Sequence, residues 1–184
     1  MCWPLSCITA SDFETKLKTR SDIQEISNVK KNQKGFSLIE LLIVVAIILI
    51  IAAIAIPNLL RSRMAANEAS AVGSLRTINT ACVTYSTTYQ SVGYPTTLGQ
   101  LGPTASATSS SADLIDSVLS AGTKSGYGFT FAAIGSNTPN TGYSVTANPT
   151  SPGTSGQRGF YTDQSGVIRA VSSGTADSTA SPLQ

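Results

Sequence analysis

Residues 34–59 read KGFSLIELLIVVAIILIIAAIAIPNL and form the most apolar part of the chain. Within it, the 21 residues from Phe36 to Ile56 are apolar apart from Ser37 and Glu40. A helix of this length extends about 31 Å and matches the roughly 30 Å hydrocarbon core of a bilayer. No comparably apolar segment elsewhere could cover it inside a soluble protein, so we predict a membrane-spanning helix.

Charged residues around the span predict its orientation. Lys30, Lys31 and Lys34 precede it, whereas only Arg61 and Arg63 follow closely. Because basic residues are retained on the cytoplasmic side, we expect a cytoplasmic amino terminus and an exported carboxy-terminal region.

The composition excludes several classes of function. Twelve Lys and Arg residues oppose ten Asp and Glu residues, and a net charge of +2 does not suit a protein that binds nucleic acid by bulk electrostatics. The chain has no His, which excludes a His-based catalytic triad, a His metal site and an imidazole pH switch. Three Cys residues are too few for a disulfide framework.

Two features of the apolar stretch do not suit a plain membrane anchor. Glu40 lies five residues into the span, where an ionisable side chain is costly and normally has a partner. The small residue Gly35 precedes the apolar run, whereas a secretory cleavage site has small residues after it.

With Gly35 before Phe36, Glu40 at the fifth position of the apolar run and Pro57 at the twenty-second, the stretch closely resembles the class III signal of type IV pilins and pseudopilins. The resemblance implies that a prepilin peptidase cleaves between Gly35 and Phe36 and methylates the new amino terminus of Phe36. It also implies that the apolar segment remains as the first half of a long helix.

The resemblance suggests a partner for Glu40. In an assembled filament, its carboxylate would meet the Phe36 amine of a neighbouring subunit. Because an unpaired charge in an apolar core costs several kcal/mol, the pair would select one register of subunit packing. Pro57 would bend or locally unwind the helix, although the same residue could instead end it.

The region after Pro57 combines one helical face with alternating strands. Between Val72 and Tyr89, apolar residues recur every three or four positions, which predicts an amphipathic helix over roughly 58–91. Strands are predicted around 127–131, 143–147, 159–162 and 167–171, and a hairpin turn at 163–166. Three or four antiparallel strands covered by the helix give an α+β fold, a pilin-like roll.

Few residues in this region have side chains that could bind a metal ion or act as a nucleophile. Asp113 and Asp116 could contribute to a Ca²⁺ site, although capping of a short helix or helical turn over Asp113–Gly122 is favoured. Cys82 lies on the apolar stripe and is predicted to be a core residue. Many pilins close a loop with a disulfide, but Cys82 is the only cysteine after the cleavage site. No cofactor is expected.

These patterns predict four segments: a cleaved leader over 1–35, a membrane and filament-core helix over 36–56, an exported head over 57–171, and a flexible tail over 172–184. The leader is long for the family. Val29 as a GTG start codon would give a short basic leader instead.

We therefore expect the precursor of a structural filament subunit and not an enzyme. The precursor would lie in the bacterial inner membrane with its head in the periplasm, and it would assemble into an extracellular type IV pilus for adhesion or motility. Its expected partners are further pilin subunits, prepilin peptidase, the inner-membrane assembly platform and membrane lipid, with no nucleic acid as a main partner. The alternatives are a periplasmic pseudopilin of a type II secretion system and a permanently membrane-anchored sensor or binding module.

Overall fold

The computed structural model describes residues 35–135 and 138–183. The predicted leader and the alternative start at Val29 lie outside the described residues, except for Gly35. One compact unit ends at Ile48 and a second begins at Leu49. Each unit is described by itself.

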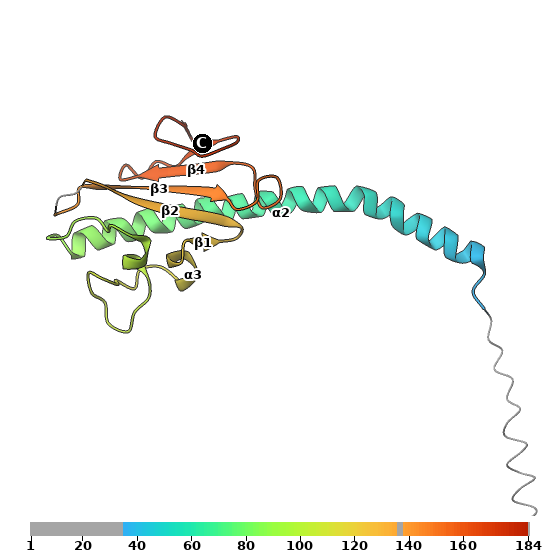
Figure 1. Ribbon diagram of the computed structural model, residues 1–184, viewed down its shortest axis with the longest axis horizontal. Coiled ribbons are helices and arrows are strands. Elements are labelled where there is room, and N and C mark those ends of the chain that lie inside the picture. The colour runs from blue at the N-terminus through green and yellow to red at the C-terminus, as the bar shows by residue number, and fades with distance from the viewer. Residues whose placement is uncertain (1–34, 136–137, 184) are drawn as a thin grey trace, which may run out of the picture. The chain divides into compact units, whose positions relative to one another are not determined.

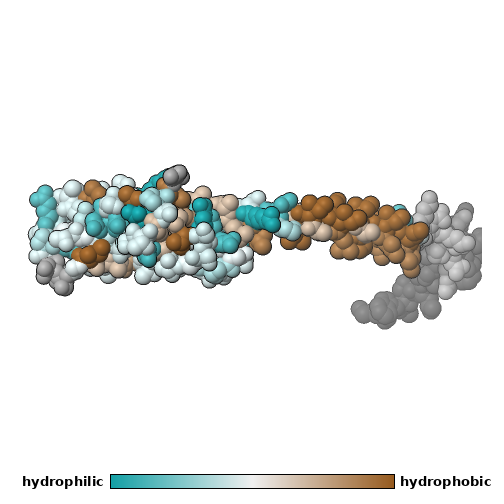
Figure 2. All heavy atoms as spheres, turned by 90° about the horizontal axis from the view of Figure 1, so that it is seen from above, coloured by the Kyte–Doolittle hydropathy of each residue, from teal (hydrophilic) through white to brown (hydrophobic). Residues whose placement is uncertain are grey.

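The helix α2 runs from Leu38 to Thr88 and belongs to both units. Its first part belongs to the stem, which we define as Phe36–Ile56. Every large apolar side chain of the stem is exposed, and Figure 2 shows this segment as a brown, hydrophobic surface. Among the described residues, α2 is the one helix long and apolar enough to cross a membrane.

The head, residues 57–183, contains a six-stranded antiparallel sheet in the order in which its strands occur along the chain (Figure 1). The bounds are β1 Thr123–Lys124, β2 Tyr127–Ile134, β3 Gly142–Pro149, β4 Gly159–Asp163, β5 Arg169–Val171 and β6 Ser181–Pro182. A 3₁₀ helix, η2, spans Leu98–Leu101, and α3 spans Ser117–Ser120. The predicted α+β class is confirmed, with the two-residue strands β1 and β6 as additions.

The core forms where the head half of α2 faces the sheet. The predicted stripe is buried from Val72 through Tyr85, and Tyr89 packs against the same core. On the sheet, Phe129 pairs with Ala147 and Ala147 with Phe160, so one register row supplies three buried side chains. Alternation along antiparallel strands directs these residues to one face, which the amphipathic helix covers.

Two local predictions can be compared with the structure. The short helix or helical turn predicted over Asp113–Gly122 is the four-residue helix α3, with Asp113 before it at φ 53° and Gly122 after it at φ 81°. Such left-handed backbone is incompatible with a continuing α-helix, and it suits the glycine at the carboxy end.

The segment after Val171, which the sequence predicts to be a flexible tail, makes packing and backbone contacts in its described part. Ala176 and Ala180 are buried, and β6 pairs with β5. The Leu183 amide also donates to the Ile168 carbonyl at 2.8 Å. A polar Ser/Thr-rich sequence hides these contacts, because they depend on small alanines and on backbone groups.

Candidate assembly and processing site

The junction between Gly35 and Phe36 lies outside regular structure. Gly35, Phe36 and Ser37 are exposed and precede the first residue of α2, Leu38. A peptidase requires an extended, accessible chain, so the backbone at this junction suits cleavage. The helix interior would not, because its amide groups are engaged in hydrogen bonds.

The glycine at position 35 has no packing role in the described chain. A Cβ atom placed there would meet nothing within 4 Å, and its φ does not lie in the left-handed region. Glycine is normally required for close approach or positive φ, and neither applies at Gly35. Recognition by a processing enzyme would account for the residue where the fold does not.

Glu40 lies in the first turn of α2, where unpaired backbone amides favour a carboxylate. It is exposed, and it belongs to neither ion pair of the described residues, Lys124–Asp116 and Arg158–Glu68. Within the described residues, the charge of this carboxylate is therefore stabilised by the amino-terminal end of α2 and by no ion pair. Pro57 lies inside α2, so the helix does not end there.

Sequence reasoning missed a clasp between the head helix and a distant loop. The buried Glu68 accepts hydrogen bonds from the Gln157 amide at 3.0 Å, the Arg158 amide at 3.2 Å and Arg158 Nε at 2.7 Å. Beside it, Asn67 Nδ2 donates to the Ser155 carbonyl at 2.8 Å. These contacts, which we call the Glu68 clasp, fix the 150–158 loop against α2.

The environment of Glu68 favours its charged form. Burial alone raises the pKa of the carboxyl, but the backbone of Gln157 and the side chain and backbone of Arg158 outweigh it. The pKa of Glu68 therefore lies below its ordinary value. Only the glutamate's position on the apolar side of the helix could have indicated burial, because its partners lie about 90 residues away.

The aspartates considered for Ca²⁺ have other roles. Asp116 caps α3 by accepting from the Leu119 amide at 2.6 Å, and its second oxygen pairs with Lys124 Nζ at 2.7 Å. The favoured capping assignment is confirmed for Asp116. Asp113 lies three residues before the cap, outside α3, and residues 35–135 and 138–183 contain no cluster of three candidate metal ligands.

Cys82 is confirmed as a core residue. Its side chain is completely buried, and burial raises the pKa of the thiol to about 12. Nearby, the Tyr143 hydroxyl donates to Asn79 Oδ1 at 3.1 Å, and burial also raises the pKa of Tyr143. A thiol that stays protonated in the core is a poor nucleophile.

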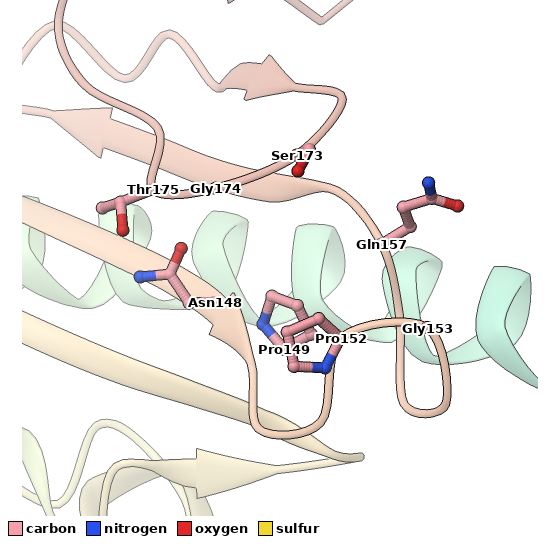
Figure 3. A pocket seen from close by; sticks show the side chains of 8 residues that line it. All are labelled: Asn148, Pro149, Pro152, Gly153, Gln157, Ser173, Gly174 and Thr175. Atoms are coloured by element: carbon pink, nitrogen blue, oxygen red, sulfur yellow. The ribbon is translucent and has the colours of Figure 1, made fainter.

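A hollow of about 460 Å³ opens at the end of β3, between the 150–158 loop and the segment around Gly174 (Figure 3). Figure 3 shows the Asn148 amide on the side of Thr175, and the rings of Pro149 and Pro152 close together. None of the eight lining residues is titratable, so this hollow offers no general acid or base.

The comparisons with known proteins each match only part of the chain. Residues 30–56 match the family described as the prokaryotic N-terminal methylation motif. Over 38 residues, 21% of this chain, the sequence is 66% identical to the type IV wide pilus major component PilA4 of Thermus thermophilus, of which 29% is covered. Over 56 residues, 30% of this chain, it is 45% identical to the type IV major pilin protein PilA of Myxococcus xanthus, of which 26% is covered.

The chain therefore matches less than a third of the length of either relative. No solved structure matches it. The chain thus carries a match to the prokaryotic N-terminal methylation motif, and part of its sequence is similar to part of a type IV wide pilus major component and of a type IV major pilin protein.

Proposed function

We propose that this chain is the precursor of a structural subunit of a type IV pilus. Prepilin peptidase cleaves it between Gly35 and Phe36 and methylates Phe36, and the stem then packs in the filament core. One observation carries the proposal: the match to the methylation motif, residues 30–56, includes the whole stem, and the large apolar side chains of this stem are all exposed. Such a surface needs lipid before assembly and other stems afterwards.

Before cleavage, the precursor lies in the inner membrane with its head in the periplasm. The stem has the length for one span, and its flanking charges support this orientation. Extraction from lipid then depends on replacing lipid contacts with those of neighbouring stems at the assembly platform. Because the two matched relatives are pilus components, the pseudopilin alternative is not favoured.

Glu40 sets the register of assembly in this proposal. Cleavage creates a charged amine on Phe36, and the Glu40 carboxylate of one subunit pairs with that amine on its neighbour. Wrong packing leaves both charges unpaired in an apolar core, at a cost of several kcal/mol. The exposed position of Glu40 in the first helical turn supports its availability for such a contact.

Processing is tested by co-expressing the chain with prepilin peptidase and determining the intact mass and amino-terminal residue of the product. A methylated Phe36 is expected, and a Gly35→Leu variant should remain uncut. Recovery of the chain from membranes with Gly35 and Phe36 still joined would refute the processing step and favour the permanent anchor.

Assembly is tested with Glu40→Gln, which keeps the size of the side chain but removes its charge. Cleavage should proceed, whereas filaments seen by electron microscopy should disappear. Ser37→Ala, three residues earlier on the same exposed segment, is the matched control and should form filaments. Normal filaments from Glu40→Gln would refute the register role of the charge.

A further inference from the structure

A polar hollow lies beside the first turns of α2 in the head, at Arg63 and Asn67. It measures about 270 Å³ and lies between three segments of the second compact unit: α2, the turn between β1 and β2, and the 150–158 loop. Its lining consists of Arg63, Asn67, Ser125, Gly126, Ser151, Thr154 and Ser155. We propose that this hollow, the Arg63 pocket, binds the phosphate of an anionic phospholipid while the subunit is in the membrane.

The depth of the pocket matches the lipid headgroups. Arg63 follows Ile56, the last residue of the apolar stem, by seven helical positions, which places it about 10 Å further along the helix. The headgroup layers add about 5–8 Å beyond each face of the hydrocarbon core. A long arginine side chain covers the remaining distance while its own backbone stays in water.

The lining chemistry suits an anion. Arginine binds phosphate through its planar array of N–H groups, and hydroxyl groups supply further donors. Ser125 Oγ already accepts from Ser70 Oγ at 2.9 Å, so its own hydrogen is free to be donated. Ser151 and Thr154 bring two more hydroxyls from the opposite loop. No carboxylate belongs to the lining.

Neighbouring contacts hold the pocket open and keep its charge positive. Asn67 holds the loop through its bond to the Ser155 carbonyl, and Glu68 is directed to Arg158 in the clasp. In the part of the chain that the structure describes, Arg63 belongs to neither ion pair. Its guanidinium is therefore available, and the nearest acid along α2 is already neutralised.

Arg61 provides a matched comparison. It is also exposed and lies at nearly the same depth, but a two-residue offset turns it about 200° around the helix, and it does not line the pocket. Diffuse attraction to an anionic surface would use both arginines about equally. If the lipid binds in a defined pocket, its affinity should depend far more on Arg63 than on Arg61.

The experiment titrates short-chain phosphatidylglycerol into the mature full-length chain in neutral detergent and counts bound lipids by native mass spectrometry. The wild type and Arg61→Gln should hold one lipid with the same midpoint. Arg63→Gln should bind about tenfold more weakly, the scale of one lost charge-assisted contact. Thr154→Val should weaken binding less, with an unchanged near-ultraviolet circular dichroism spectrum showing that its head is folded.

Three results would overturn the proposal: equal weakening by Arg61→Gln and Arg63→Gln, no weakening by either, or equal binding of zwitterionic phosphatidylcholine. Inorganic phosphate at millimolar concentration should not displace the lipid. Displacement of the lipid by phosphate would assign the pocket to a free anion instead. The inference rests on the proposed membrane-resident precursor, whose insertion is measured separately by flotation with vesicles. A chain that floats without selective binding refutes only the lipid pocket.

Discussion

Replacing Glu68 with alanine removes the acceptor on which the 150–158 loop depends. Three donors converge on this carboxylate, from the Gln157 amide and from the amide and Nε of Arg158. Counted at the roughly 1 kcal/mol of an ordinary protein hydrogen bond, the two backbone bonds contribute about 2 kcal/mol. The half-exposed Arg158 side chain adds less than about 1 kcal/mol, because solvent screens it. We therefore expect a loss of about 2–3 kcal/mol in the free energy of unfolding of the head.

The assay is urea unfolding of the mature chain in detergent, followed by tyrosine circular dichroism. A folded-state pKa below the ordinary value means that the charged carboxylate stabilises the head at neutral pH. This contribution is complete above the ordinary pKa of 4.5 and is lost as the pH falls through the lower folded-state value. Glu68→Gln should be less stable than the wild type at pH 7, and the difference should shrink in acid.

Asp116→Asn is the matched control, because it neutralises an ion-paired but exposed carboxylate, and its effect should be much smaller. The reasoning would be refuted if Glu68→Ala unfolded within about 0.5 kcal/mol of the wild type, the range of ordinary surface substitutions. A difference between Glu68→Gln and the wild type that stays constant down to pH 3 would refute the electrostatic part alone.

Three further predictions concern the core, the thiol and the tail. Leu75→Ala, at a completely buried position, should cost about 2–5 kcal/mol in urea unfolding, whereas Val83→Ala, 51% exposed on the same helix, should cost less than about 1 kcal/mol. With a pKa of about 12, Cys82 should resist iodoacetamide at pH 8 until urea unfolds the head, as peptide mass mapping would show; rapid native labelling would contradict its burial. Ala176→Asp should destabilise the head by burying an unpaired charge, while Ser178→Asp at an exposed site should not. Equal stabilities of these two variants in urea unfolding would contradict the burial of Ala176.

Much of the fold was predictable because its determinants are local. The spacing from Val72 to Tyr85 specifies a helical face without knowledge of its partner, and the alternation at Tyr127 and Phe129 specifies a strand face in the same way. The hairpin between β4 and β5 also follows from a short turn sequence. In contrast, the segment around α3 contains two residues with positive φ, Asp113 before the helix and Gly122 after it, and at Asp113 the residue type gives little warning of this.

The residues of the candidate site also differ in whether a local sequence pattern reveals them. Gly35, Phe36 and Glu40 lie within six consecutive residues, so their spacing can be recognised in the sequence alone. The Glu68 clasp joins residues about 90 positions apart, and no local pattern assigns Glu68 to Arg158 rather than to another base. The same holds for the Arg63 pocket, whose walls come from three distant segments.

The clasp and the pocket are physically connected, since both depend on the 150–158 loop. Asn67 and Glu68 hold this loop from one side of α2, and Thr154 of the same loop lines the pocket with Arg63. Loss of the clasp should therefore release one wall of the pocket even though Arg63 remains. Glu68→Ala should weaken phosphatidylglycerol binding, because one wall of the pocket is lost. If the attraction were purely electrostatic, the same substitution would strengthen lipid binding, because it removes a negative charge near the pocket. The sign of that change separates a structured site from a diffuse positive surface.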